Sequence, residues 1–329
     1  MTTFNRRGLI AATLAASVLA TTARAGAKPI PVIFHTDIGY DVDDTWALLL
    51  LLRRPELDLK LVVTDVSNMA YRARVAAKLL VLGHREDVVV AVGPDATDAP
   101  GPQSDWVGEF ELKDYPGKVR YDGAQAIVDT IMSSNEPVTI ISTGPATLSA
   151  AALKLEPAIA AKARFIGMDG SVRLGYGGAP TPAVEYNVKI DPAALRAVFA
   201  ADWLSCSITP VDTCGLLILD GDDMQTVRNS SDPFARACIR NSEVWLPNAP
   251  WMPKDFDLRK NSSTLFDAVA VVMAYDESDL VMETLNLTVT DEGMTLIDPK
   301  GRPVRVATAW KDLAGFKKRM AADLTSRPA

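Results

Sequence analysis

Short hydrophobic runs alternate with amphipathic stretches along most of the chain. Runs rich in Val, Ile and Leu predict strands at 29–36, 59–64, 88–92, 138–142 and 164–168. Helical spacing of apolar residues predicts helices at 44–54, 72–82, 124–133 and 146–155. The strands are continuous apolar runs, which is typical of strands buried on both faces. The pattern therefore predicts an α/β fold, with an open, mostly parallel sheet and helices on both faces.

Loops and a different C-terminal pattern complete this picture. Stretches rich in Pro and Gly at 94–121, 170–182 and 244–263 predict long loops, which are often lids or binding loops. A helix at 265–275, short strands at 285–290, 294–297 and 304–307, and a closing helix at 310–323 are expected beyond them. No internal repeat or dividing linker is evident, so residues 26–329 are expected to form a single domain.

Residues 1–25 have the composition of an export signal. A basic start is followed by a short apolar segment and by Ala23-Arg24-Ala25. The adjacent Arg6 and Arg7 indicate a twin-arginine signal, and an ordinary secretory signal with two chance arginines is the alternative. We expect a periplasmic or secreted protein that begins near Gly26. No later segment has the pattern of a membrane span, so no membrane association is expected after cleavage.

Composition narrows the chemistry. The 329-residue chain has a net charge of -7, which argues against nucleic acid or an anionic membrane surface as a partner. The two histidines, His35 and His84, argue against a multi-histidine zinc site. The three cysteines, Cys206, Cys214 and Cys238, are an odd number; one disulfide bond and three buried thiols both remain open.

A cluster of aspartates follows the first predicted strand. Asp37, Asp41, Asp43 and Asp44 lie between the end of that strand and the start of the next helix. Ligands gather at the carboxyl ends of strands in open parallel sheets. A helix cap would account for one or two of the four, but not for Asp37 at the end of the strand. Because four neighbouring carboxylates repel one another, the cluster predicts a bound hard cation.

These motifs resemble the nucleoside hydrolase family, whose usual opening is Asp-Thr-Asp-Pro-Gly-x-Asp-Asp-Ala. Asp37 matches the second aspartate of that opening, and Asp43 and Asp44 match the closing pair, with two extra residues between them. Four further segments follow in the family's order: Ser67-Asn68, Ser142-Thr143-Gly144-Pro145, Glu185-Tyr186-Asn187 followed by Asp191-Pro192-Ala193-Ala194, and Phe266-Asp267-Ala268-Val269-Ala270. The resemblance runs from about residue 32 to 275.

The resemblance implies a Rossmann-like nucleoside hydrolase fold and a Ca²⁺-dependent hydrolase of N-glycosidic bonds in ribonucleosides or related ribosyl compounds. Asp37, Asp44, Asp267 and the backbone carbonyl of Thr143 would hold the ion, and Asp37 would act as the general base. The ribose hydroxyls would be bound by four residues: Asp43, Asn68, Glu185 and Asn187. A small nucleoside or ribosyl substrate and a homodimer or homotetramer are further implied, as is a role in purine or pyrimidine salvage.

The chain also departs from the family pattern. His35 replaces the family's first aspartate, Phe266 stands where many members carry a histidine to which protonation of a purine leaving group is ascribed, and Ala179 replaces an asparagine. Asp169-Gly170 stands where Gly-Gly is usual. These changes leave the expected metal ligands in place and alter the half of the site that would recognise the base. Four aromatic residues are candidates to stack on a base or, alternatively, to pack in the core: Tyr176, Trp245, Trp251 and Phe256.

Other functions fit parts of the sequence. A hydrolase of the same fold could act on another glycosyl substrate. A non-catalytic periplasmic sugar- or nucleoside-binding protein would keep the metal and the sugar contacts without turnover. A phosphatase of the haloacid dehalogenase type is disfavoured, because its strand-end motif is Asp-x-Asp and Asp37 is followed here by Ile38-Gly39.

Overall fold

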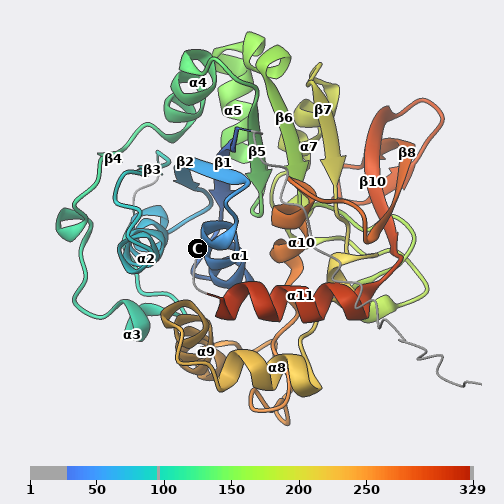
Figure 1. Cartoon of the computed structure of the whole chain (residues 1–329). Helices are drawn as coiled ribbons and strands as arrows, with labels where there is room; N and C mark the ends of the chain where they lie inside the picture. Colours follow the sequence, from blue (N-terminus) through green and yellow to red (C-terminus); the bar gives the residue numbers. More distant parts are fainter. Residues whose placement is uncertain (1–27, 95–96, 327–329) are drawn as a thin grey trace, which may run out of the picture.

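The computed structural model, which describes residues 28–94 and 97–326, is built on a ten-stranded sheet (Figure 1). The strand order is β4-β3-β2-β1-β5-β6-β7-β10-β8-β9. Neighbouring strands from β4 to β10 are parallel, whereas β8 and β9 extend the sheet with antiparallel pairs. The predicted α/β class and the mostly parallel sheet are confirmed. The predicted export signal lies outside the described residues.

The elements have the following bounds. The strands are β1 (Ile30–Thr36), β2 (Leu57–Thr64), β3 (Val89–Val92), β4 (Val119–Arg120), β5 (Val138–Ser142), β6 (Ala163–Gly167), β7 (Ser205–Ile208), β8 (Leu280–Val289), β9 (Thr295–Ile297) and β10 (Arg302–Trp310). The α-helices are α1 (Asp43–Arg53), α2 (Met69–Leu82), α3 (Ser104–Val107), α4 (Gly123–Ser133), α5 (Thr147–Leu155), α6 (Tyr186–Ile190), α7 (Pro192–Ala200), α8 (Gly221–Arg228), α9 (Pro233–Trp245), α10 (Phe266–Met273) and α11 (Leu313–Thr325).

The prediction for the last helix was wrong at its start. Trp310 is the final residue of β10, and the helix begins at Leu313. Asp312 fixes this boundary, because its carboxylate accepts a hydrogen bond from the backbone amide of Gly315 at 2.8 Å, a helix N-cap. Strand β7 and helices α7 to α9 were not predicted, although α7 carries buried apolar residues at helical spacing in Leu195, Val198 and Phe199.

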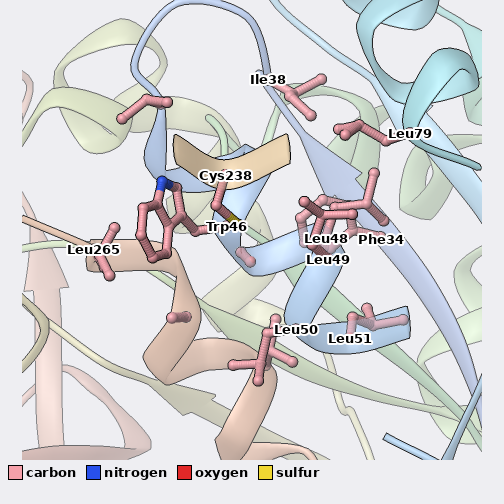
Figure 2. Packing of buried hydrophobic residues seen from close by; sticks show 14 of the residues in the cluster. Phe34, Ile38, Trp46, Leu48, Leu49, Leu50, Leu51, Leu79, Cys238 and Leu265 are labelled. Carbon is pink, nitrogen blue, oxygen red and sulfur yellow. The ribbon is translucent and has the colours of Figure 1, made fainter. Parts of the chain in front are cut away.

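Two hydrophobic cores lie on opposite faces of the sheet. Successive strand residues alternate between them: Val32 and Phe34 face one core, and Ile33 faces the other. Helices α1, α2, α10 and α11 cover the first face, and α4, α5 and α7 cover the second (Figure 1). Figure 2 shows the centre of the first core, where Trp46 and the leucines of α1 pack with Phe34, Leu79 and Leu265. Helix α1 is therefore a nearly fully buried element.

The chain order places the main crevice of the sheet between β1 and β5. From β1 the chain builds outward through β2, β3 and β4, and then returns to add β5 on the other side of β1. In open α/β sheets, such a reversal leaves a crevice at the carboxyl ends of the two strands, where ligands bind. Asp37 follows β1 and Thr143 follows β5, so these two residues face each other across it.

Two further expectations concern cysteines and membrane association. Cys206, Cys214 and Cys238 are all free thiols, so the disulfide alternative is excluded for this structure. Burial raises the pKa of each thiol, which makes all three poor nucleophiles. Among the helices of residues 28–94 and 97–326, none combines the length and hydropathy of a membrane span.

Candidate functional site

A cavity of about 280 Å³ opens at the carboxyl ends of the central strands. Its lining comes from the segments that follow β1, β5, β6 and α9, and from the starts of α1, α6 and α10. The lining residues are Asp37, Tyr40, Asp41, Asp43, Asp44, Thr143, Met168, Tyr176, Glu185, Tyr186, Asn187, Trp251, Phe266 and Asp267. Seven of the eight site residues predicted from the sequence are in this set, and Asn68 is not.

Three of the lining carboxylates form a group with the dimensions of a metal site. Asp43, Asp44 and Asp267 are buried, and each offers one oxygen within 4.8 Å of the others. Asp43 and Asp44 lie in the first turn of α1, and Asp267 lies in the first turn of α10. The N-terminal ends of both helices carry partial positive charge, which favours carboxylates there. Asp37 lies beside this group, and repulsion from Asp37 contributes to the raised pKa of all three.

Two threonines hold the carboxylate of Asp44 in one orientation. The hydroxyl of Thr36 donates to Asp44 Oδ1 at 2.5 Å, and the hydroxyl of Thr143 donates to the same oxygen at 2.8 Å. The backbone amide of Ile38 donates to the Thr36 hydroxyl at 3.0 Å, which fixes the direction of that hydrogen bond. With Oδ1 held by β1 and β5, the second oxygen of Asp44 is the one available to a ligand.

Gly144 brings the end of β5 close to Asp37. A Cβ atom at Gly144 would lie 2.8 Å from the Asp37 backbone nitrogen and 2.9 Å from its Cβ. Any side chain there would push the β5 end away from Asp37. The glycine of the Thr143-Gly144 pair is therefore required for the close approach of the two strand ends.

Burial raises the pKa of carboxyl groups that line the cavity. Desolvation is the main cause of the raised pKa of Asp37, Asp43 and Asp267, with repulsion from neighbouring carboxylates adding to it. Burial, with repulsion from Asp37, raises the pKa of Asp44 to about 8. Burial also raises the pKa of Glu185 to about 7. Such a group of buried carboxylates needs a cation to be fully ionised at neutral pH.

Glu185 and Asn187 are both used in holding the backbone at the cavity wall. The Glu185 carboxylate caps α6: it accepts hydrogen bonds from the amides of Asn187 at 2.8 Å, Val188 at 3.1 Å and Gly170 at 3.1 Å. The Asn187 side-chain nitrogen donates to the Thr143 carbonyl at 3.0 Å and to the Met168 carbonyl at 2.8 Å. Asn187 therefore presents its Oδ1 atom, rather than its nitrogen, to a ligand.

Asn68 lies apart from the cavity in this structure. It has a left-handed backbone conformation, with φ 54°, just before α2. Its side-chain Oδ1 accepts a hydrogen bond from the Thr97 hydroxyl at 3.2 Å, and its backbone amide donates to the same hydroxyl at 3.0 Å. The role in ribose binding that the family resemblance implies for Asn68 stays a prediction.

His35 belongs to a buried hydrogen-bond network behind the cavity. Its Nε2 atom is 2.8 Å from Asp65 Oδ2, and its Nδ1 atom is 2.9 Å from the Ser149 hydroxyl and 3.1 Å from the Ser142 hydroxyl. The backbone amide of Leu148 also donates to Asp65, at 2.8 Å. Where the family has an aspartate, this chain has an imidazole that links β1 to β2, β5 and α5.

Arg72 is a buried guanidinium that holds two site loops together. Its Nη1 atom donates to the carbonyl of Ile38 at 3.1 Å, and its Nε atom donates to the carbonyls of Val66 at 3.0 Å and Ser67 at 2.9 Å. Its positive charge lowers the pKa of Asp37 and Asp44 against the effect of burial. No periodicity in the sequence singled out this residue, because its partners belong to loops.

The aromatic residues of the cavity differ from those expected. Trp251 and Tyr176 line it, but Trp245 is fully buried and donates its Nε1 hydrogen to the Tyr40 carbonyl at 3.1 Å. Phe256 packs against the first core. Sequence reasoning missed two aromatic lining residues, Tyr40 and Tyr186, although both adjoin motif residues, and that proximity was the available signal.

Comparison with known proteins assigns the family. The fold and the site define an α/β protein that binds its ligand among carboxylates at the switch point of a parallel sheet. A sequence model described as inosine-uridine preferring nucleoside hydrolase matches residues 32–318. The chain therefore belongs to the inosine-uridine preferring nucleoside hydrolase family, and the resemblance in its motifs is confirmed.

Curated relatives match over part of their length. The pyrimidine-specific ribonucleoside hydrolase RihA of Salmonella newport is 33% identical over 181 residues, which cover 52% of this chain and 57% of that protein. RihA of Citrobacter koseri is 29% identical over 217 residues, which cover 63% of this chain and 68% of that protein. The matched region thus spans little more than half of the length of the first of these relatives.

Solved structures show the same fold. A plant nucleoside hydrolase, the PpNRh1 enzyme, superposes with a TM-score of 0.73 at 21% identity, covering 90% of this chain and 98% of that one. A purine-preferring ribonucleoside hydrolase from Gardnerella vaginalis gives a TM-score of 0.72 at 22% identity, covering 90% and 99%. The predicted nucleoside hydrolase fold is confirmed over nearly the whole of the chain.

Proposed function

We propose that this protein is a Ca²⁺-dependent hydrolase that cleaves the bond between ribose and the leaving group of ribonucleosides or related ribosyl compounds. The observation that carries the proposal is the buried group of Asp43, Asp44 and Asp267, with Asp37 beside it, at the switch point of a nucleoside hydrolase fold. The family membership and the relatives named as ribonucleoside hydrolases support the reaction type.

The donor set fits a hard divalent cation. Carboxylate oxygens are the ligands that Ca²⁺ prefers, and none of the described residues that line the cavity is Lys, Arg or His. We assign Asp37, Asp44, Asp267 and the Thr143 carbonyl to the cation. Asp43 lies beside these ligands, in the group that it forms with Asp44 and Asp267. When bound, the ion would orient and acidify a water molecule and bind sugar hydroxyls.

The protein's own residues would carry the remaining steps. Asp37 would take the proton of the attacking water, as a general base. Asp43, Glu185 and Asn187 would bind the ribose hydroxyls, and Asn68 would join them if its loop approached the cavity. The sugar gains positive charge as the bond to the leaving group breaks, and the surrounding carboxylates would stabilise that charge.

The localisation and the oligomeric state of the protein are also proposals. The basic, apolar and Ala-x-Ala pattern of residues 1–25 supports export to the periplasm or beyond, where the enzyme would salvage nucleosides. A single domain over residues 26–329 and a homodimer or homotetramer complete the proposal.

Sugar release tests this proposal. The purified protein is incubated with Ca²⁺ and a panel of ribosides: uridine, inosine, and 4-nitrophenyl β-D-ribofuranoside, whose leaving group departs without a proton donor. We expect reducing sugar to appear with at least one of them and to be abolished by Asp37→Asn. Absence of hydrolysis with every riboside, in protein whose melting temperature rises with Ca²⁺, would indicate a binding protein and contradict the proposal.

A further inference from the structure

Three aromatic rings form a stack at the wall of the cavity. The Tyr40 ring lies 4.7 Å from the Trp251 ring, at an interplanar angle of 21°, and 5.8 Å from the Tyr186 ring, at 8°. The three side chains are 39%, 41% and 37% exposed, respectively, although such residues usually bury their rings. A ring face that no stacked neighbour covers can bind a planar ring or a cation.

The charge of this cavity is strongly one-sided. None of the described residues that line it is lysine, arginine or histidine. Six lining residues are acidic: Asp37, Asp41, Asp43, Asp44, Glu185 and Asp267. Where these carboxylates ionise, one divalent cation balances two of their charges, and the buried Arg72 guanidinium, which is not part of the lining, acts on Asp37 and Asp44. Asp41 lies outside the Asp43, Asp44 and Asp267 group; it follows Tyr40 directly and lines the same cavity as Trp251, and its carboxylate accepts a hydrogen bond from the Val42 amide at 2.6 Å.

Among the described residues that line this cavity, none is a histidine that could protonate an uncharged leaving base. When the bond to C1′ breaks, its electron pair stays with the base, which becomes an anion unless a side chain protonates it. Phe266 takes part in the cavity wall at the start of α10, and a phenyl ring donates no proton. Burial raises the pKa of the Tyr186 hydroxyl to about 12, so this tyrosine is a weak acid.

A heterocycle that is already cationic avoids this difficulty. We propose that the preferred substrates are ribosides whose ring nitrogen carries a formal positive charge, namely N-ribosylpyridinium compounds, held by the Tyr40, Trp251 and Tyr186 stack and by the Asp41 carboxylate. This inference rests on the proposed ribohydrolase function. Cation–π attraction to the rings and Coulomb attraction to Asp41 both act on the charged ring and not on its neutral counterpart.

The reaction balances without a proton donor for the leaving group. The C1′–N bond breaks, and both of its electrons pass to the ring nitrogen, which becomes neutral. An oxygen–C1′ bond forms with water, and the proton lost by that water passes to the Asp37 carboxylate. The products are ribose, a neutral pyridine and one proton. The neutral product loses its attraction to the rings and to Asp41, which favours its release.

Competing substrates test the inference. The kcat/KM values of nicotinamide riboside, which is a pyridinium cation, and of uridine are measured in the wild type, in Asp41→Asn and in Trp251→Leu. We expect the cationic riboside to be preferred by about tenfold or more, and each variant to reduce that preference by about tenfold. Asp105→Asn, which neutralises an exposed aspartate on α3, is the matched control and should leave the preference unchanged.

Inhibition of the wild-type protein tests the inference without any variant. The 1-methylpyridinium-3-carboxamide cation and uncharged pyridine-3-carboxamide are compared as inhibitors of 4-nitrophenyl riboside hydrolysis, and the cation should inhibit about tenfold more strongly. Equal inhibition, or uridine cleaved as fast as the cationic riboside, would overturn the inference and leave the ribohydrolase function intact. Failure of every riboside, the nitrophenyl compound included, would overturn both.

Discussion

The side-chain nitrogen of Asn187 donates a hydrogen bond of 3.0 Å to the backbone carbonyl of Thr143. Asn187 lies in α6 and Thr143 follows β5, so this contact ties a short surface helix to the central crevice of the sheet. The same nitrogen reaches the Met168 carbonyl at 2.8 Å, after β6. Asn187 thus sets the direction of the carbonyl that we assign to the cation.

Replacing Asn187 tests this anchoring role. In Asn187→Asp, a carboxylate oxygen would face two carbonyl oxygens, and both would lose their donor. We expect the free energy of unfolding to fall by roughly 2–4 kcal/mol, measured by urea denaturation. Asn229→Asp, at an exposed position after α8, is the control and should change stability little. A loss as small as that of the control would show that the contact does not order the site.

Removal of Arg72 should destabilise the loops on which the cavity is built. Arg72→Met deletes three hydrogen bonds to the carbonyls of Ile38, Val66 and Ser67 and leaves these atoms without a partner. We expect a loss of roughly 3 kcal/mol in the free energy of unfolding. Arg236→Met, at an exposed position on α9, provides the comparison. Equal stability of the two variants would show that Arg72 does not hold the two site loops together.

The carboxylate cluster predicts a pH-dependent response to calcium. The folded-state pKa of Asp44 is raised to about 8, and those of Asp43 and Asp267 are raised as well. Because the folded pKa is raised, protonation of these carboxyl groups favours the folded, metal-free protein. This contribution to the free energy of unfolding is complete below the unfolded pKa of about 4 and is lost as pH rises towards 8. The stabilisation by Ca²⁺ should therefore grow between pH 5 and pH 8.

Thermal melts in chelator and in excess Ca²⁺ measure this response. At a Ca²⁺ concentration about 100 times the dissociation constant, the stabilisation should be about 2.7 kcal/mol. A calcium effect that is constant across this pH range would mean that the cluster is not the site of binding.

Asp169 is a buried carboxyl group whose replacement should stabilise the protein. Both of its carboxylate oxygens lack a hydrogen-bond partner among the described residues, and burial, with repulsion from Glu185, raises its pKa well above the usual value. The wild type therefore loses stability as pH rises above the unfolded pKa. Asp169→Asn removes this charge, and we expect it to match the wild type near pH 4 and to exceed it by roughly 1–3 kcal/mol at pH 8. Denaturation curves at the two pH values are the measurement, and a variant less stable than the wild type at pH 8 would contradict the account.

The parts of the site that could be predicted from the sequence are those that follow strands. Asp37 and Thr143 end buried apolar runs, and the βα alternation alone brings the ends of such runs to one edge of the sheet. Asp43, Asp44 and Asp267 were found because helix starts and family motifs both mark them. Their grouping within 4.8 Å could not be read from the sequence, since it depends on how α1 packs against α10.

Contacts between distant loops were beyond such reasoning. Arg72 and the contact between His35 and Asp65 join segments through single side chains, and no local pattern encodes such pairs. Trp245 and Trp251 have similar sequence surroundings, yet one is buried and the other lines the cavity, because α9 ends between them. Residue type suggested stacking for both, and packing decided which one is available.

The calcium dependence of riboside cleavage tests the central claim most directly. The initial rate of 4-nitrophenyl riboside hydrolysis is measured in chelator-treated protein as free Ca²⁺ is raised, with Asp267→Asn alongside. We predict no turnover without the ion, a saturating rise in the wild type and a rise shifted to much higher Ca²⁺ in the variant. A rate in chelator equal to the rate in Ca²⁺ would contradict the proposed metal-dependent hydrolase.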